Sequence, residues 1–249
     1  MKSYIASLVL GLLAASNSNA ELVTFDYTAK VRLASHYTNH GSAMASLQSV
    51  SFNGTRIDIG NTVRGSFTLD LDTPVSMYAP DQGPGSTYIE YGNPNGGASK
   101  NLMTMRIDQS GYTFAPTPDG RDVRIAIEDG DVGHYDYFIF TNTMHDLDSG
   151  RSETIRLDLS QENGTLLSST RLPSTLNLSR IESAHLTYNL QGAGNSEGYT
   201  INSDLTSLSV RTTSPVPEPS THAMLALGLL TVGAVSRRKR RGSTAALGA

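Results

Sequence analysis

The stretch VTFDYTAKVRL, residues 23–33, decides the fold of this chain, because its side chains alternate strictly in polarity. Successive side chains of an extended segment point to opposite faces, so one face here is apolar and the other polar. The apolar face carries Val23, Phe25, Tyr27, Ala29, Val31 and Leu33, and the polar face carries Thr24, Asp26, Thr28, Lys30 and Arg32. This period of two is typical of an antiparallel strand that packs one face on a core.

The same alternation recurs through most of the chain. It occurs at residues 63–71, 103–107, 123–127, 155–159, 185–190 and 205–210. Residues 135–140, YDYFIF, are apolar on both faces except at Asp136, which is typical of a central strand. Turns rich in Gly, Pro and Asp, such as PDQGPG, YGNPNGG and EDGDVG, separate these segments. We therefore predict an all-β fold, an antiparallel β-sandwich or jelly-roll-like body, over residues 21–213.

The N-terminus, MKSYIASLVLGLLAASNSNA, is typical of a signal peptide over residues 1–20. Lys2 supplies the positive start, and the apolar run that follows is too short to span a membrane. Small residues precede the expected cut, so we predict cleavage by signal peptidase after Ala20.

The charge of the chain is unevenly distributed. The totals are 19 basic and 23 acidic residues; without Lys2, the basic residues 237–241 and Glu218, the remainder keeps 13 basic and 22 acidic residues, a net charge of −9. An acidic body argues against binding of nucleic acid, which needs a basic face. Cysteine is absent, which excludes disulfides, thiolate metal sites and a cysteine nucleophile.

The C-terminal stretch VPEPSTHAMLALGLLTVGAVSRRKRR, residues 216–241, has a different character from the body. We predict a short transmembrane helix over residues 222–236, although its apolar part reaches only roughly 20 Å against a hydrocarbon core of ~30 Å. Five basic residues follow it, and they would stay cytoplasmic and leave the body outside. They are Arg237, Arg238, Lys239, Arg240 and Arg241. The alternative is an apolar helix packed on the domain with a solvated basic end.

Three features in this order resemble the PEP-CTERM sorting signal over residues 214–241. They are the motif Pro217, Glu218, Pro219 and Ser220, the short apolar helix, and the basic cluster. The tail at residues 242–249, which we expect to be disordered, departs from the usual pattern. The resemblance implies a Gram-negative exported protein, processed by exosortase, anchored transiently in the cytoplasmic membrane, then placed at the cell surface or in the extracellular matrix. It also implies an association with exopolysaccharide and biofilm.

The body also resembles the domains that often precede such signals. The resemblance rests on VRGSFTLDLDTP (residues 63–74), RLPSTLNL (residues 171–178) and INSDLTSLSV (residues 201–210). It implies a shared architecture and no catalytic residue.

Acidic residues in turns are the candidates for calcium ligands. The pair Asp70 and Asp72 flanks a strand end, and IEDGDVGHYD offers Glu128, Asp129, Asp131 and Asp136. We single out Asp129 and Asp131, although the spacing of an EF-hand is lacking and tight turns explain both stretches as well. MHDLDSG, residues 144–150, is a weaker candidate of the same kind.

Other candidate residues carry less specific signals. The pair His36 and His40 has a helical metal spacing, but its stretch is loop-like and lacks an HExxH frame, which argues against a metal. His134 and His145 flank a predicted strand and could face each other's loops, although surface histidines are the simpler account. Tyr88 and Tyr91 could stack on a sugar, although core packing explains them too. The Asn-x-Ser/Thr sites at Asn53, Asn163 and Asn177 carry little meaning in a bacterium.

No motif for a nucleophile or a phosphate-binding loop occurs. We therefore expect no catalytic residue, cofactor or metal site, and a structural or glycan-binding protein with exopolysaccharide as its candidate ligand. Two alternatives remain open: a secreted glycan hydrolase or lyase, and a calcium-dependent matrix protein.

Overall fold

The computed structural model describes residues 21–38, 43–52, 54–80, 86–92, 99–116, 121–130, 134–146, 149–162, 164–192 and 197–211. Its strands are β1 (Leu22–Thr38), β2 (Ala43–Leu47), β3 (Ser49–Phe52), β4 (Thr55–Asp58), β5 (Thr62–Asp70), β6 (Val75–Pro80), β7 (Ser86–Tyr91), β8 (Leu102–Ile107), β9 (Thr113–Phe114), β10 (Arg121–Gly130), β11 (Tyr135–Asp146), β12 (Arg151–Glu162), β13 (Ser183–Gln191) and β14 (Glu197–Arg211), with one 3₁₀ turn, η1 (Leu178–Arg180). The predicted signal peptide, sorting signal and tail lie outside these residues.

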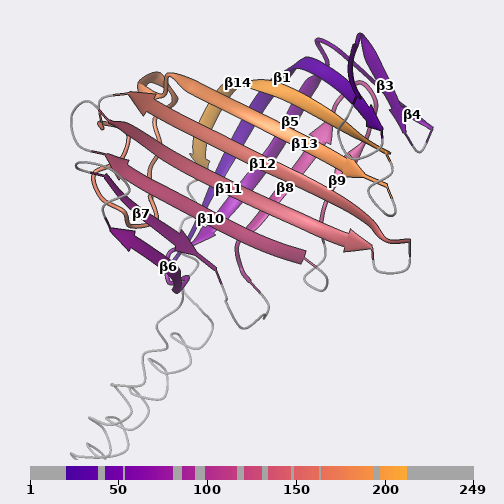
Figure 1. The fold of residues 1–249 in the computed structure, drawn as a ribbon. Helices are drawn as coiled ribbons and strands as arrows, with labels where there is room; N and C mark the ends of the chain where they lie inside the picture. Colours follow the sequence, from indigo (N-terminus) through magenta and orange to yellow (C-terminus); the bar gives the residue numbers. More distant parts are fainter. Residues whose placement is uncertain are drawn as a thin grey trace, which may run out of the picture. The chain divides into compact units, whose positions relative to one another are not determined.

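Twelve of the strands form one antiparallel sheet. The strand order is β6-β7-β10-β11-β12-β13-β14-β1-β5-β8-β9, with β2 paired to β1 beside this path, and β3 and β4 form a separate hairpin. In Figure 1, β10 to β13 form a near layer, and β1, β5 and β8 cross behind it. The all-β antiparallel prediction is confirmed, but the predicted division into two sheets is wrong. Apart from the β3–β4 hairpin, the described strands form a single sheet that curls into a half-barrel.

The long strand β1 lets the sheet curl without breaking. It has 17 residues and pairs with β14 on one side and with β5 and β2 on the other. Its pairing with β14 shifts register between Thr28 and Ala29 and again between Val31 and Leu33. Bulges of this kind bend a strand and increase its twist, so β1 belongs to both layers of the curl.

The register shift near residue 32 also corrects one part of the sequence prediction. Phe25, Ala29 and Val31 are buried as the alternation predicts, but Leu33 is only partly buried, and Ala34 is buried in its place. The extra residue in β1 moves the following side chains to the opposite face. Strict alternation therefore holds only up to the bulge.

The core fills the concave side of the half-barrel. The Phe67 ring on β5 stacks on Phe25 with ring centroids 4.7 Å apart, and lies 6.0 Å from Phe138 and 5.8 Å from Phe140 on β11. Strands β5 and β11 are far apart in the sheet order, so the curl brings them face to face. This contact explains why the sequence resembles that of a sandwich.

Glycine permits close aromatic packing at two places on β1. Gly65 lies opposite Tyr27 and Gly198 opposite Tyr37, and a Cβ at either glycine would clash with the tyrosine ring. The Tyr27 hydroxyl donates to the Thr104 carbonyl oxygen at 2.8 Å across the bare glycine. Gly65, the glycine of the 63–71 stretch, is thus explained by the close approach of the Tyr27 ring to the β5 backbone.

Strand β11 is central, as predicted, since it pairs with β10 and β12. Its inward side chains Phe138 and Phe140 are fully buried, whereas Tyr135 is 45% exposed. Tyr137 and Ile139 on the same outer face are partly exposed. The strand therefore presents an aromatic outer face that the described residues leave uncovered.

Among the described residues, no helix is long and apolar enough to cross a membrane. The helix predicted at residues 222–236 lies outside them.

Candidate functional site

The residues of the predicted sorting machinery are not among those described. This holds for Ala20, for the motif at residues 217–220 and for the basic cluster at residues 237–241. The candidate sites that the structure can place all belong to the β body.

The first acidic candidate, at Asp70 and Asp72, is a turn. The Asp70 carboxylate accepts a hydrogen bond from the Asp72 backbone N–H at 3.2 Å, and its other oxygen lies 4.0 Å from Lys100 Nζ. Thr73 closes the same turn by donating to the Asp70 carbonyl oxygen at 2.6 Å. The tight turn that was the alternative to a calcium site explains these contacts.

The second acidic candidate does not form one cluster. Asp129 lies near the end of β10 opposite Thr87 and is partly exposed, and Asp131 lies outside the described residues, so a calcium role for this pair stays a prediction. Glu128 lies opposite Tyr137 on the outer face, whereas Asp136 is fully buried on the inner face. The proposed grouping of Asp136 with the loop carboxylates is therefore wrong.

Asp136 has a structural function instead. Its two carboxylate oxygens accept hydrogen bonds from the backbone N–H groups of Gly130, at 2.9 Å, and Leu167, at 2.8 Å. The side chain thus ties the end of β10 to the segment that follows β12. Within the described ranges, no group of three or more His, Asp or Glu side chains is placed to hold a metal ion.

The histidine candidates do not form pairs. The His36 ring stacks on Tyr199 with centroids 4.8 Å apart, and its Nε2 lies 3.7 Å from a Glu197 carboxylate oxygen. His40 lies outside the described residues. The expectation that His134 and His145 face each other is wrong, because they lie at opposite ends of β11, which at ~3.3 Å per residue separates them by roughly 36 Å.

The two tyrosines of the STYIEY stretch have different environments. Tyr91 is 8% exposed, and its hydroxyl donates to the Thr170 carbonyl oxygen at 2.6 Å, so it packs in the core. Tyr88 lies on the outer face, where its hydroxyl donates to Glu90 at 2.5 Å and accepts from Arg124 at 3.0 Å.

Tyr88 lines a shallow hollow on the outer face. The hollow has a volume of about 230 Å³ and is lined by Tyr88, Ala126, Glu128, Tyr137 and Ile139. The register places Glu128 between the two tyrosines, with Tyr88 on β7 and Tyr137 on β11 directly opposite it. The small side chain of Ala126 leaves room beside this row. Tyr137 was not a candidate from the sequence, because residues 135–140 are apolar on both faces and their one polar residue, Asp136, shares the face of Phe138.

Charged groups border this hollow. Partial burial opposes ionisation of Glu90, but hydrogen bonds from Arg124 and Tyr88 outweigh it and lower the pKa of Glu90. Burial and the hydrogen bond to Glu90 raise the pKa of Tyr88, and burial raises that of Tyr137. At neutral pH the hollow thus presents neutral tyrosines beside an ion pair.

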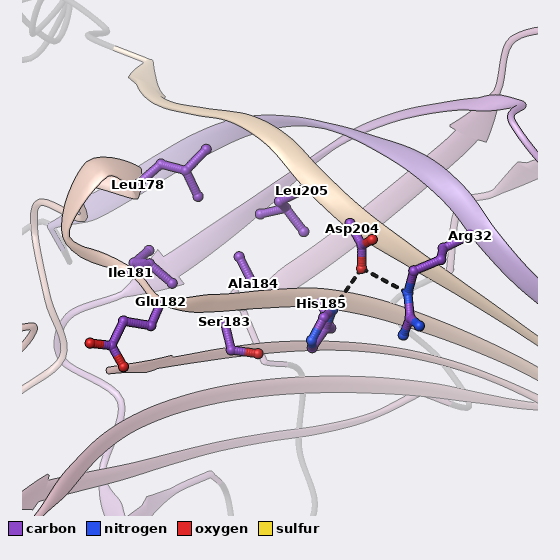
Figure 2. A pocket seen from close by; sticks show the side chains of 9 residues that line it. All are labelled: Arg32, Leu178, Ile181, Glu182, Ser183, Ala184, His185, Asp204 and Leu205. Atoms are coloured by element: carbon purple, nitrogen blue, oxygen red, sulfur yellow. Dashed lines mark hydrogen bonds and ion pairs between the residues drawn. The ribbon is translucent and has the colours of Figure 1, made fainter. Parts of the chain in front are cut away.

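A larger hollow opens where β13 and β14 stop pairing (Figure 2). The last paired residues are His185 and Asp204. The hollow has a volume of about 540 Å³. Its apolar lining comes from Leu178, Ile181, Ala184 and Leu205, and its polar lining from Arg32, Glu182, Ser183, His185 and Asp204.

Asp204 organises the polar side of this hollow. One of its oxygens accepts a hydrogen bond from Arg32 Nε at 3.1 Å and lies 2.9 Å from His185 Nδ1. Figure 2 shows both side chains directed at the same carboxylate. A carboxylate on one ring nitrogen orients an imidazole and leaves the other nitrogen for a ligand or a proton. No local pattern in the sequence indicated this group, whose members come from β1, β13 and β14.

A third polar group lies inside the curl. The Tyr112 and Tyr188 hydroxyls donate to the same Glu153 carboxylate oxygen at 2.6 and 2.9 Å, and the hydroxyls also contact each other. Burial, foremost, and the neighbouring Glu153 raise the pKa of both tyrosines far above the usual value. Nearby on β11, Asn142 is fully buried, and its amide has no hydrogen-bond partner among the described residues.

Comparison with known proteins identifies one segment of the chain. The family model of the PEP-CTERM protein-sorting motif matches residues 215–241. No curated protein and no solved structure is significantly similar to the chain. The match confirms the sorting motif predicted from the sequence.

Proposed function

Since the chain carries a PEP-CTERM protein-sorting motif, the mark of an exported protein that exosortase sorts to the cell surface, we propose that its β body binds polysaccharide there without turning it over. The ligand is the exopolysaccharide of the biofilm matrix. Signal peptidase removes residues 1–20, and the segment 222–236 anchors the chain transiently in the cytoplasmic membrane before exosortase acts.

The observation that carries the binding proposal is the tyrosine hollow on the outer face. Tyr88 and Tyr137 flank Glu128 in one row across three neighbouring strands, β7, β10 and β11. Tyrosine offers an apolar ring and a polar hydroxyl, a combination that suits sugars, which have apolar C–H faces and polar edges. Carboxylates at Glu128 and Glu90 can accept hydrogen bonds from sugar hydroxyls.

The size of the hollow suits one unit of a chain. Its volume of about 230 Å³ is below the ~300–1,000 Å³ of pockets that enclose a small molecule. A polysaccharide can lie along such an open face and place single sugars in the hollow. The strand surface is rigid, so binding orders few side chains, which favours affinity.

Retention on polysaccharide extracted from the native host tests this proposal. The full chain should bind saturably, and Tyr137→Ala should raise the Kd about tenfold or more, a change of ~1.4 kcal/mol. Ile59→Ala is the matched control, because Ile59 is an exposed apolar side chain outside the hollow. Equal retention of the two variants would contradict a site at the tyrosine hollow.

A secreted glycan hydrolase or lyase is the second candidate, favoured by the Asp204–His185 contact. These residues line the hollow of about 540 Å³, which is large enough for a substrate, and the oriented imidazole has the form of a general base. Product release from the same polysaccharide, lost in Asp204→Asn and kept in Tyr137→Ala, would establish this candidate. We propose the non-enzymatic function, for which no product is expected.

A further inference from the structure

Strand β6 forms one end of the sheet and is unusually apolar for an edge. It pairs with β7 on one side, and no strand of the described ranges pairs with its other side. Its sequence, VSMYAP, contains no charged residue. Of the six large hydrophobic side chains exposed in the described residues, three belong to β6: Val75 at 50%, Met77 at 44% and Tyr78 at 60%.

Uncharged, apolar edge strands are templates for another strand, and most proteins protect them with charge. Here the protection is partial. The pairing with β7 shifts register between Val75 and Met77, and Pro80 lacks a backbone N–H. These two features bracket Met77, Tyr78 and Ala79, which remain free for regular pairing on the open side.

We propose that β6 pairs antiparallel with β6 of a second copy of this chain, centred on Tyr78. Such a pair is self-complementary, because a two-fold axis places Tyr78 opposite Tyr78 of the second copy and Met77 opposite Ala79. The two sheets then continue into each other across the new pair.

Charge opposes a second copy least at this edge. The body carries a net charge of −9 without its termini, so two copies repel each other over most of their surfaces. At β6 the strip is neutral. On the neighbouring strand β7, the carboxylate of Glu90, opposite Met77, is held in an ion pair with Arg124.

The opposite end of the sheet does not offer the same contact. Strand β9 has two residues, and Phe114, one of them, is buried. The neighbouring Arg64 and Asp108 form an exposed ion pair at 2.8 Å. The two ends therefore differ in length, charge and exposed apolar surface, and β6 alone of them suits self-pairing.

Pairing through β6 would place the two outer faces on the same side. The tyrosine hollows, centred on β10 of each copy, would lie five strand spacings apart, roughly 24 Å at ~4.8 Å each. If the proposed polysaccharide binding holds, one chain of sugar could engage both hollows, which raises apparent affinity without new contacts. The pairing itself does not depend on that function.

A three-residue contact is small, so the pair is weak and is best detected by covalent trapping. The chain contains no cysteine, which makes single-cysteine variants of the full chain specific reporters. Facing residues of an antiparallel pair have Cβ atoms about 4.5–5.5 Å apart, within reach of a disulfide or a short cross-linker.

The experiment uses Tyr78→Cys, Met77→Cys and Ala79→Cys, with Ser207→Cys on β14 as an exposed control away from the edge. Tyr78→Cys should give several-fold more covalent homodimer than Ser207→Cys. A mixture of Met77→Cys and Ala79→Cys proteins should cross-link more than either alone, because the register sets these residues opposite each other. These positions lie at an edge, so the variants should keep the wild-type melting temperature.

Equal dimer yields from Tyr78→Cys and Ser207→Cys would overturn the proposal. If the mixture of Met77→Cys and Ala79→Cys proteins gives no more covalent dimer than either protein alone, the register about Tyr78 is wrong, and so is the symmetric pair. If Tyr78→Cys cross-links only to a different protein, the edge binds another partner, which contradicts self-pairing. At low protein concentration the pair dissociates, so polysaccharide retention measured there tests the binding function alone. This measurement distinguishes failure of self-pairing from failure of polysaccharide binding.

Discussion

Two clusters of tyrosine and glutamate, one inside the curl and one outside it, use the same side chains for different ends. Inside, Tyr112 and Tyr188 donate to Glu153, and Tyr188 is 1% exposed. Outside, Tyr88 donates to Glu90, which also forms an ion pair with the largely exposed Arg124. The chemistry is similar, and access to water differs.

That difference determines what each cluster can do. Buried hydroxyls and carboxylates must satisfy one another, because an unpaired polar group away from water costs about 1–3 kcal/mol. The inner cluster therefore constrains how β8, β9, β12 and β13 pack. The outer cluster can exchange its hydrogen bonds with water or with a ligand, which makes it available for binding.

The largest expected effect comes from removing one tyrosine of each cluster. Tyr188→Ala should lower the free energy of unfolding by about 3–5 kcal/mol, since it removes a fully packed ring. Tyr88→Ala should lower it by at most about 1 kcal/mol, because the ring lies on the open face. Urea denaturation of both variants measures the comparison, and equal losses would remove the distinction between the clusters.

High pH should act on the inner cluster. The folded pKa values of Tyr112 and Tyr188 are raised above 10.0, so the unfolded chain loses these protons first as the pH rises. The stabilisation is fully present below pH 10 and is lost above it, by about 1.4 kcal/mol per pH unit for each tyrosine.

Tyr188→Phe should therefore make the decline of stability above pH 10 shallower. Tyr78→Phe, which removes a hydroxyl from an exposed tyrosine, is the control. Chemical denaturation at pH 9 and above, within reach of the usual tyrosine pKa of ~10, would measure both slopes. Parallel slopes in the two variants would argue against buried, neutral tyrosines in the core.

Glutamine at each glutamate tests the carboxylates at nearly constant shape. Glu153→Gln should cost about 1–2 kcal/mol, because the hydroxyls of buried Tyr188 and half-buried Tyr112 lose a charged acceptor. Glu90→Gln should cost less than ~1 kcal/mol, because Arg124, its partner in the ion pair, is exposed to solvent. Melting temperatures under identical buffer conditions compare the two losses of stability. Their ratio would approach one if Glu153 were solvated in the folded protein.

The smallest effect is expected from salt. Arg124→Gln should change stability by less than ~1 kcal/mol, and the difference from wild type should shrink as salt rises from 0.05 to 0.5 M, since exposed ion pairs are screened. Denaturation at the two salt concentrations measures it. A difference that persists at high salt would place Arg124 in a packed environment, contrary to its exposed side chain.

Much of the strand content could be predicted because alternation is a local property. Phe25, Phe67 and Leu157 are buried where the period of two places them. The prediction failed at Leu33, where a bulge in β1 shifts the phase, and no residue type near Arg32 signals that bulge. Asp136 was assigned to a loop cluster because sequence position alone does not reveal that its carboxylate is turned inward to two backbone N–H groups.

The sequence by itself determined the sorting motif at residues 215–241 and the all-β class, because both depend on the order of neighbouring residues. Only the tertiary structure decided that the strands form one curled sheet, that Tyr88 and Tyr137 line one hollow on either side of Glu128, and that Asp204 contacts His185. The physical reason is that period and composition specify which face of a strand is buried, whereas the choice of neighbour depends on pairing between segments distant in the chain.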